Sequence, residues 1–293
     1  MRISTAILIC TLLGLAHCPA AAFDGIRVTL LGTGTADSPA PQGGPGTLIE
    51  TGDEVLLFDC GQGTLERIER AGLAAFDVTA VFLTSLDREH VEGCAEFWSA
   101  ARTGGAIQEF SVWGPAGTAD LFRRIDQELG TGSGESTRAF DIVDNVVYQP
   151  DSVTVTAFVS DSRTQSQHFG YRVDARKRAV VLASDAGSPE NIARFARGVQ
   201  LMMQEVSGRK ESDVAAGSFV RPSPEEAGRL FRASRPYLAV YSHVMADGAT
   251  EEELLRRTRR SYRGPVHIGR DLMVIEVQNE VQIRSAPSEP RLR

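Results

Sequence analysis

The stretch from Val78 to Gly93 constrains the fold of this chain more than any other. Its first six residues, Val78-Thr79-Ala80-Val81-Phe82-Leu83, are mostly apolar and rich in β-branched side chains, which predicts a buried strand. The loop that follows carries Asp87, Glu89 and His90 within four positions. A strand end can aim several oxygen and nitrogen donors at one point, so this loop is a candidate metal site. An ordinary polar turn, with acids near a helix start, is the alternative that this segment alone leaves open.

The same pattern recurs along the chain, where apolar runs of strand length end in polar or glycine-rich turns and helical patterns follow several of them. Strands are predicted at residues 26–31, 47–50, 55–58, 78–83, 110–113, 141–148, 153–159, 170–173, 179–182, 199–203, 237–241 and within 265–277. Helices are predicted at residues 65–71, 91–102, 117–130, 189–197, 224–233 and 251–260. The sequence shows no internal repeat and no long linker. It therefore predicts an α/β fold in which two sheets are sandwiched between helices, an αββα four-layer sandwich.

The first 22 residues have the pattern of a secretory signal peptide. Arg2 supplies the positive end, residues 6–15 the apolar centre, and residues 20–22 a small-residue cleavage site. The apolar segment is too short to span a bilayer as a helix. We expect cleavage before Phe23, a single domain over residues 23–293, and export to the periplasm or the medium. Cys18 suggests a lipoprotein as an alternative, but His17 is a poor residue before a lipidated cysteine.

The charge of the mature chain argues against nucleic acid as a partner. Removing residues 1–22 takes away one arginine and no acid, so the formal net charge changes from −7 to −8. An acidic chain without a basic run is poorly suited to making many phosphate contacts. Cys60 and Cys94 remain after cleavage, and an exported protein permits a disulfide between them; two buried free thiols are the equal alternative. The sequence does not determine the oligomeric state.

Six short motifs, taken in order, resemble those of the metallo-β-lactamase superfamily, in the branch that holds ribonuclease Z and the arylsulfatase-like hydrolases. The resemblance covers residues 26–277, and it implies the αββα fold of that superfamily. The matching motifs are Leu31-Gly32-Thr33-Gly34, Phe58-Asp59-Cys60-Gly61-Gln62-Gly63-Thr64, Gly170-Tyr171-Arg172, Asp185, Ser242-His243 and Gly269-Arg270-Asp271-Leu272-Met273. Asp59, at a strand end, is placed to orient a neighbouring ligand.

The metal motif departs from that of the superfamily, T-H-x-H-x-D-H. Ser85 replaces its first histidine, Asp87 its second and Glu89 its aspartate, whereas His90 remains. A further ligand histidine of the superfamily falls near Ser162. The first metal position has therefore lost its imidazoles.

The second metal position is better preserved. The resemblance implies that His90, Asp185 and His243 hold an ion there, with Glu89 in place of aspartate; Asp87 is a further oxygen donor, at the first position. The mature chain has only four histidines, with His168 and His267 expected in structural or surface roles, so a conventional two-metal site cannot be built. We therefore expect one zinc ion per chain.

The resemblance implies a hydrolase with one zinc position, acting on a small ester-like or phosphodiester-like substrate, and the signal peptide predicts that it is secreted. Glu89 and Asp185 are the expected catalytic carboxylates, with Glu89 either a ligand or the base. Arg221 falls near a histidine that assists leaving groups in ribonuclease Z; it is either a surface charge or a guanidinium that binds an anionic substrate. A catalytically degenerate binding module is the alternative function. Ribonuclease Z activity ranks lower, because of the signal peptide, the acidic charge and the missing histidines.

Overall fold

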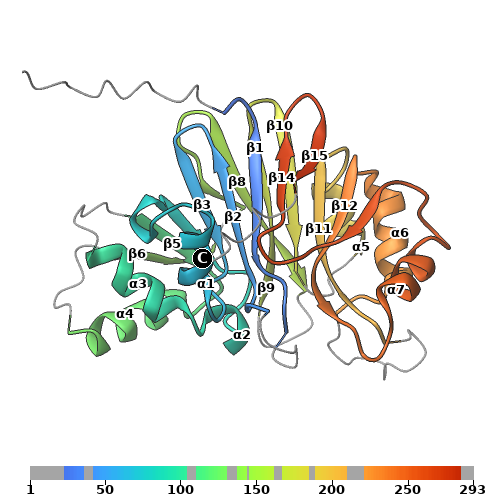
Figure 1. Cartoon of the computed structure of the whole chain (residues 1–293). Helices are drawn as coiled ribbons and strands as arrows, with labels where there is room; N and C mark the ends of the chain where they lie inside the picture. Colours follow the sequence, from blue (N-terminus) through green and yellow to red (C-terminus); the bar gives the residue numbers. More distant parts are fainter. Residues whose placement is uncertain are drawn as a thin grey trace, which may run out of the picture.

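Two β-sheets packed face to face form the centre of the protein, with helices on the outer side of each sheet (Figure 1). The structure is a computed structural model that describes residues 23–35, 42–103, 110–130, 137–143, 145–161, 167–184, 189–209 and 221–284. This arrangement is the predicted αββα sandwich. The predicted signal peptide lies outside the described residues.

The first sheet contains, within the described ranges, eight strands in the order β15-β14-β1-β2-β3-β4-β5-β6. Their bounds are β1 Ile26–Gly32, β2 Gly46–Thr51, β3 Glu54–Phe58, β4 Ala80–Phe82, β5 Phe110–Gly114, β6 Thr137–Asp141, β14 Val274–Val277 and β15 Val281–Arg284. β1, β2 and β3 pair in antiparallel fashion, and β3 to β6 run parallel. Parallel pairing brings the carboxyl ends of β3 and β4 to the same edge.

The second sheet has seven strands in the described part of the chain, in the order β13-β12-β11-β10-β9-β8-β7. Their bounds are β7 Val146–Tyr148, β8 Val153–Asp161, β9 His168–Ala175, β10 Arg178–Ala183, β11 Leu201–Ser207, β12 Leu238–Met245 and β13 Val266–Ile268. β10 to β13 run parallel. The carboxyl ends of β11 and β12 are therefore also neighbours.

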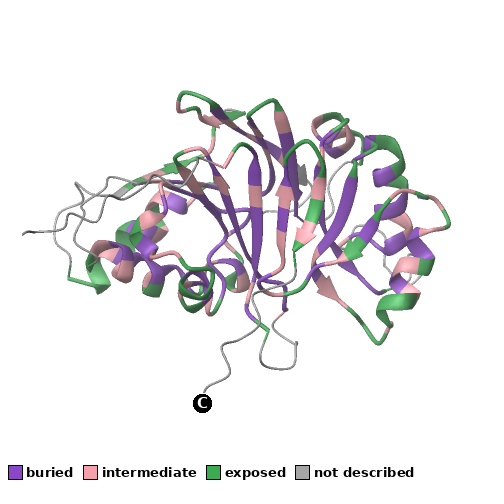
Figure 2. Cartoon of the chain, turned by 45° about the horizontal axis from the view of Figure 1, so that its top comes forward, coloured by how far each residue is buried: buried purple, intermediate pink, exposed green. Residues whose placement is uncertain are grey.

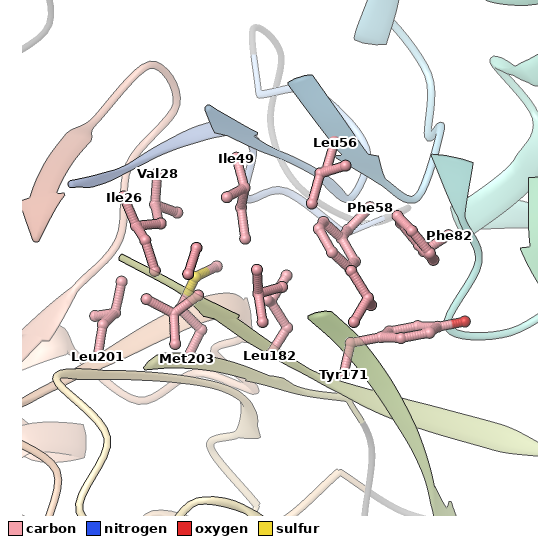
Figure 3. Packing of buried hydrophobic residues seen from close by; sticks show 14 of the residues in the cluster. Ile26, Val28, Ile49, Leu56, Phe58, Phe82, Tyr171, Leu182, Leu201 and Met203 are labelled. Atoms are coloured by element: carbon pink, nitrogen blue, oxygen red, sulfur yellow. The ribbon is translucent and has the colours of Figure 1, made fainter. Parts of the chain in front are cut away.

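The main core lies between the two sheets, where their inward-facing side chains interdigitate (Figure 3). Phe58 and Phe82 of the first sheet stack at 4.9 Å between ring centroids, and Tyr171 of the second meets Phe58 edge-on at 5.4 Å. Tyr171 is fully buried, and its hydroxyl donates to the carbonyl oxygen of Leu83 at 2.6 Å. This bond ties the end of β4 to the opposite sheet.

The helices form the two outer layers. Against the first sheet lie α1 Thr64–Arg70, α3 Cys94–Thr103 and α4 Thr118–Glu128, with the short α2 Arg88–Val91 at the sheet edge (Figure 1). Against the second lie α5 Pro189–Phe195, α6 Pro224–Ser234 and α7 Glu251–Thr258. Their outward faces are exposed and the strands between them are mostly buried, as four layers require (Figure 2).

The helix predicted over residues 91–102 is α3, which begins at Cys94, and Glu92 and Gly93 separate it from the short helix α2, which ends at Val91. The backbone N–H of Gly93 donates to the carbonyl oxygen of Cys60 at 2.8 Å, and a Cβ at Gly93 would collide with the carbonyl oxygen of Gly61. This close approach fixes α2 against the loop that follows β3. It therefore sets the position of His90, which lies in α2.

Candidate metal centre

The loop after β4 is held in place by a carboxylate that precedes it by 25 residues. Asp59 follows β3 directly and has a positive φ of 60°, a backbone conformation uncommon for residues other than glycine. Its side chain accepts hydrogen bonds from the backbone N–H and the hydroxyl of Thr84, both at 2.8 Å. These two hydrogen bonds join the end of β3 to the end of β4.

Asp59 also orients His90. The Nδ1 atom of His90 lies 3.0 Å from Oδ2 of Asp59, and both side chains are buried. A carboxylate only accepts hydrogen bonds, so Nδ1 carries the proton and Nε2 is left with the lone pair. Ligand histidines in metal sites commonly show this carboxylate–histidine pairing. The expectation that Asp59 orients a ligand agrees with this contact.

A second pair of the same kind comes from the other sheet. Nδ1 of His243, in β12, lies 3.1 Å from Oε2 of Glu205, in β11. Both residues are buried, and the neighbouring parallel strands fix their spacing. As with His90, the proton on Nδ1 leaves the lone pair on Nε2.

The two histidines face Glu89 with their Nε2 atoms. Glu89 places Oε1 at 3.8 Å from Nε2 of His90 and Oε2 at 3.9 Å from Nε2 of His243. One ligand atom from each of these three residues lies within 4.8 Å of the other two. Glu89, His90 and His243, which we call the ligand triad, thus converge although His243 is more than 150 residues away in sequence.

The ligand triad fits a zinc ion. Two imidazole nitrogens and one carboxylate form a donor set that zinc accepts, with a fourth position left for water or substrate. Nε2 of His243 is buried and has no hydrogen-bond partner among the described residues, which is costly for a polar atom unless a ligand satisfies it. A cavity of about 30 Å³ lined in part by Asp59, Glu205 and His243 leaves room for a small species nearby.

Arg221 reaches the same place. Its Nη2 contacts Oε1 of Glu89 and lies 3.2 Å from Nδ1 of His243, and its Nε donates to Oε2 of Glu205 at 2.9 Å. The Arg221 side chain is only 9% exposed, so it is not the surface charge that was one of its two predicted roles. A buried guanidinium is rare unless paired, and here it pairs with two carboxylates.

These charges control the protonation of both carboxylates. Burial raises the pKa of Glu89, but the Arg221 guanidinium, together with the neighbouring imidazoles of His243 and His90, outweighs that effect and leaves the pKa lowered. For Glu205, burial again raises the pKa, whereas His243 and Arg221 bring it well below its usual range. Both side chains are therefore ionised at neutral pH.

The other predicted site residues are distributed as follows. Asp87 is half-exposed, and its Oδ2 lies 3.6 Å from Nε2 of His168 rather than within the ligand triad. His168 is buried beside it, which excludes a surface role, and His267 is exposed on β13. Asp185, predicted as a ligand and a catalytic carboxylate, lies outside the described residues.

Glu205 was not identified as a functional residue from the sequence. Its signal is the one that singled out Asp59, a carboxylate at the end of an otherwise apolar strand. The last family-like motif has a structural role instead: Asp271 accepts from the backbone N–H of Thr33 and of Gly43 and from Arg67, which fixes the turn after β1.

The two cysteines among the described residues do not form a disulfide. Cys60 and Cys94 are free thiols, and both are fully buried. A hydrogen bond with Cys94, together with burial, raises the pKa of the Cys60 thiol well above its usual range. Buried thiols are poorly accessible to reagents, so this pair belongs to the packing between α3 and the first sheet.

The chain is similar in sequence to known proteins. A family model described as the beta-lactamase superfamily domain matches residues 55–244. Ribonuclease Z of Mycobacterium sp. (strain KMS) is 27% identical over 285 residues, covering 89% of this chain and 99% of that protein.

Solved structures are similar in fold. The metallo-beta-lactamase fold protein YhfI of Bacillus subtilis superposes with a TM-score of 0.74 at 18% identity, covering 86% of this chain and 99% of YhfI. The short form of human tRNase Z superposes with a TM-score of 0.69 at 21% identity, with the same coverage of both chains.

Proposed function

The chain belongs to the metallo-β-lactamase superfamily, on the branch of ribonuclease Z, and from this premise we propose that it is a hydrolase with one zinc ion held by His90, His243 and Glu89. The observation that carries the proposal is the pair of carboxylate–histidine contacts, Asp59–His90 and Glu205–His243, which turn both Nε2 atoms toward Glu89. Two such pairs from different sheets are difficult to explain by packing alone, because each buries a charged carboxylate.

Each residue has a defined task in this proposal. Zinc would supply Lewis acidity toward a water molecule and a substrate oxygen. Asp59 and Glu205 keep the protons of the two imidazoles on Nδ1, so that Nε2 can bind the metal. The lowered pKa of Glu89 keeps this carboxylate ionised, as a ligand must be. Asp185 remains a proposed additional ligand and catalytic carboxylate.

The proposed substrate is a small ester-like or phosphodiester-like molecule. The ligand triad can hold one ion and offers no donors of its own for a second, which suits substrates that need one Lewis acid. Among the described residues, no helix is long and apolar enough to cross a membrane.

Cleavage of RNA is a second candidate, and the similarity over 89% of the chain to proteins named ribonuclease Z favours it. The same similarity leans against the expectation, drawn from the acidic charge, that nucleic acid is not a partner. The loss of imidazoles at Ser85 and Asp87 argues the other way, since a two-metal clamp cannot form there with histidines.

The test compares the wild-type protein with His243→Ala and with the matched control His267→Ala, since His267 is exposed and is not a member of the ligand triad. We expect about one zinc per chain by elemental analysis in the wild type and the control, and a loss of metal in His243→Ala. Hydrolysis of bis(p-nitrophenyl) phosphate and p-nitrophenyl acetate should fall with the metal content.

Three outcomes would change the proposal. Two tightly bound ions would mean that oxygen donors rebuild the first position. No zinc binding and no turnover by any of the three proteins would favour a binding module. Cleavage of a 3′-extended precursor tRNA that His243→Ala abolishes, without hydrolysis of the small esters, would favour the second candidate.

A further inference from the structure

Arg221 occupies a position that the proposed hydrolase does not require. Its guanidinium contacts Glu89, a member of the ligand triad, and Glu205, which orients His243. Its side chain is 9% exposed, against 6% for Glu205 and 25% for Glu89. One cation thus contacts both a ligand and the group that orients a second ligand.

The charges of Arg221, Glu89 and Glu205 offset one another. Two ionised carboxylates, the buried Glu205 and the partly buried Glu89, repel each other, and each costs free energy as far as it leaves water. The guanidinium offsets both effects, since its planar fork can bond two carboxylates at once. The Nε atom of Arg221 donates to Glu205 and its Nη2 atom donates to Glu89, so the guanidinium lies between the two carboxylates.

A zinc ion in the ligand triad would share Glu89 with this cation. Oε1 of Glu89 contacts Arg221, whereas Oε2 faces Nε2 of His243. The ion would lie close to a fixed positive charge in a poorly solvated place, where like charges repel strongly. Arg221 would also withdraw electron density from Glu89 and Glu205, which weakens the first as a donor and the second as a partner of Nδ1.

We propose that Arg221 is a resident cation of the metal centre, which neutralises Glu89 and Glu205 in the metal-free protein and weakens zinc binding by competing for Glu89. This inference rests on the proposed zinc site, which it extends from the ligands to the control of metal affinity.

The test measures zinc affinity by isothermal titration for the wild type, Arg221→Gln, Arg221→Lys and the control Arg270→Gln. Arg270 pairs with Glu251 on the surface at 2.8 Å, so its replacement removes the same charge from an exposed ion pair. We expect Arg221→Gln to bind zinc at least about tenfold more tightly than the wild type. Arg221→Lys, which keeps the charge, and Arg270→Gln should change the affinity less than about threefold.

Thermal unfolding gives a second readout. Without zinc, Arg221→Gln should have a lower Tm than the wild type, because the buried Glu205 and the partly buried Glu89 lose their partner. Added zinc should raise the Tm of Arg221→Gln more than it raises that of the wild type. If Arg221→Gln does not fold without metal, ¹⁵N spectra of arginine side chains in the wild type, assigned with Arg221→Lys, should show the Arg221 signal moving on zinc addition.

The outcomes separate the two proposals. Equal or weaker zinc binding by Arg221→Gln, or an Arg221 signal that zinc leaves unchanged, would overturn the resident cation and leave the proposed hydrolase standing. No zinc binding by any folded variant would overturn the hydrolase and this inference together.

Discussion

Single carboxylates determine which nitrogen of each ligand histidine is available. His90 and His243 each have one nitrogen facing a buried carboxylate and the other facing Glu89. The carboxylate costs free energy to bury, and the hydrogen bond offsets part of that cost. The same geometry without the negative charge would leave the proton free to move to Nε2, where it blocks the metal.

Asp59→Asn tests this dependence. The substitution keeps the shape of the side chain but removes the charge that holds the proton on Nδ1 of His90. We expect zinc affinity to fall by about 10- to 100-fold, the usual effect of removing such a partner. Competition with a chromogenic chelator would measure it, and Thr84→Ser, which retains the hydroxyl bonded to Asp59, should behave as the wild type. Equal affinities in all three would mean that Asp59 only supports the loop.

The elements around the site are held together by side chains that bridge them. α6 begins at a capping box, in which Ser223 and Glu226 exchange hydrogen bonds. α7 is joined to it by Arg257, which is buried and bonds Glu225 at 2.8 Å and the carbonyl oxygen of Arg209 at 2.7 Å. The Glu225–Arg257 pair fixes α6 against α7, and both helices follow Arg221 in the chain.

The Glu225–Arg257 pair makes stability depend on acid pH. The hydrogen bond from Arg257 outweighs burial and lowers the pKa of Glu225 below its ordinary value of 4.5. A lowered folded-state pKa contributes stability that is fully present above pH 4.5 and lost as the pH falls below it. Glu225→Gln should therefore unfold at lower urea concentration than the wild type at pH 7, with a smaller difference at pH 3.5.

Glu252→Gln is the matched control, since Glu252 is exposed in the first turn of the same α7 helix. Its urea midpoint should stay within experimental error of the wild type at both pH values. A difference between Glu225→Gln and the wild type that stays constant from pH 7 to pH 3.5 would contradict the assignment to this carboxylate.

At the scale of the whole molecule, the aromatic core holds the two sheets together and thereby sets the distance between His90 and His243. Phe82 is fully buried, stacked on Phe58 at 4.9 Å and on Trp113 at 5.4 Å between ring centroids. It belongs to the strand that leads into the loop of His90, whereas His243 comes from the opposite sheet. Loss of packing at Phe82 would therefore affect both stability and the site.

Phe82→Ala should lower the free energy of unfolding by about 3–5 kcal/mol, the usual range for a buried phenylalanine. Phe76→Ala, at a position that is 39% exposed, should cost less than about 1 kcal/mol. Urea unfolding followed by far-UV circular dichroism measures both. A loss at Phe82 no greater than at Phe76 would contradict a core located between the sheets.

Export concerns the whole chain and stays a prediction, because residues 1–22 lie outside the described structure. The apolar centre and the small residues before Phe23 predict a mature chain that begins at Phe23. Mass spectrometry of the protein from fractionated cells should find that N-terminus in the periplasm or the medium. An intact Met1 in the cytoplasmic fraction would refute the prediction and would strengthen the RNA-cleavage candidate.

The sequence by itself determined the layered fold and the side chains available for the site. Alternating apolar runs and polar turns, such as Val78–Leu83 followed by Asp87 to His90, fix which segments are buried strands and where chemistry can gather. The number of histidines limited the possible metal positions in the same way. These properties depend on composition and on spacing along the chain.

Only the tertiary structure decided which of those side chains meet. Asp87 and Glu89 are two residues apart in sequence, yet Asp87 lies beside His168 and Glu89 joins the ligand triad. Glu205 and Arg221 entered the site because strand pairing and the packing of two sheets bring distant segments together. Sequence periodicity specifies the face of an element, but the position of that element against another depends on close contacts such as that of Gly93 with Gly61.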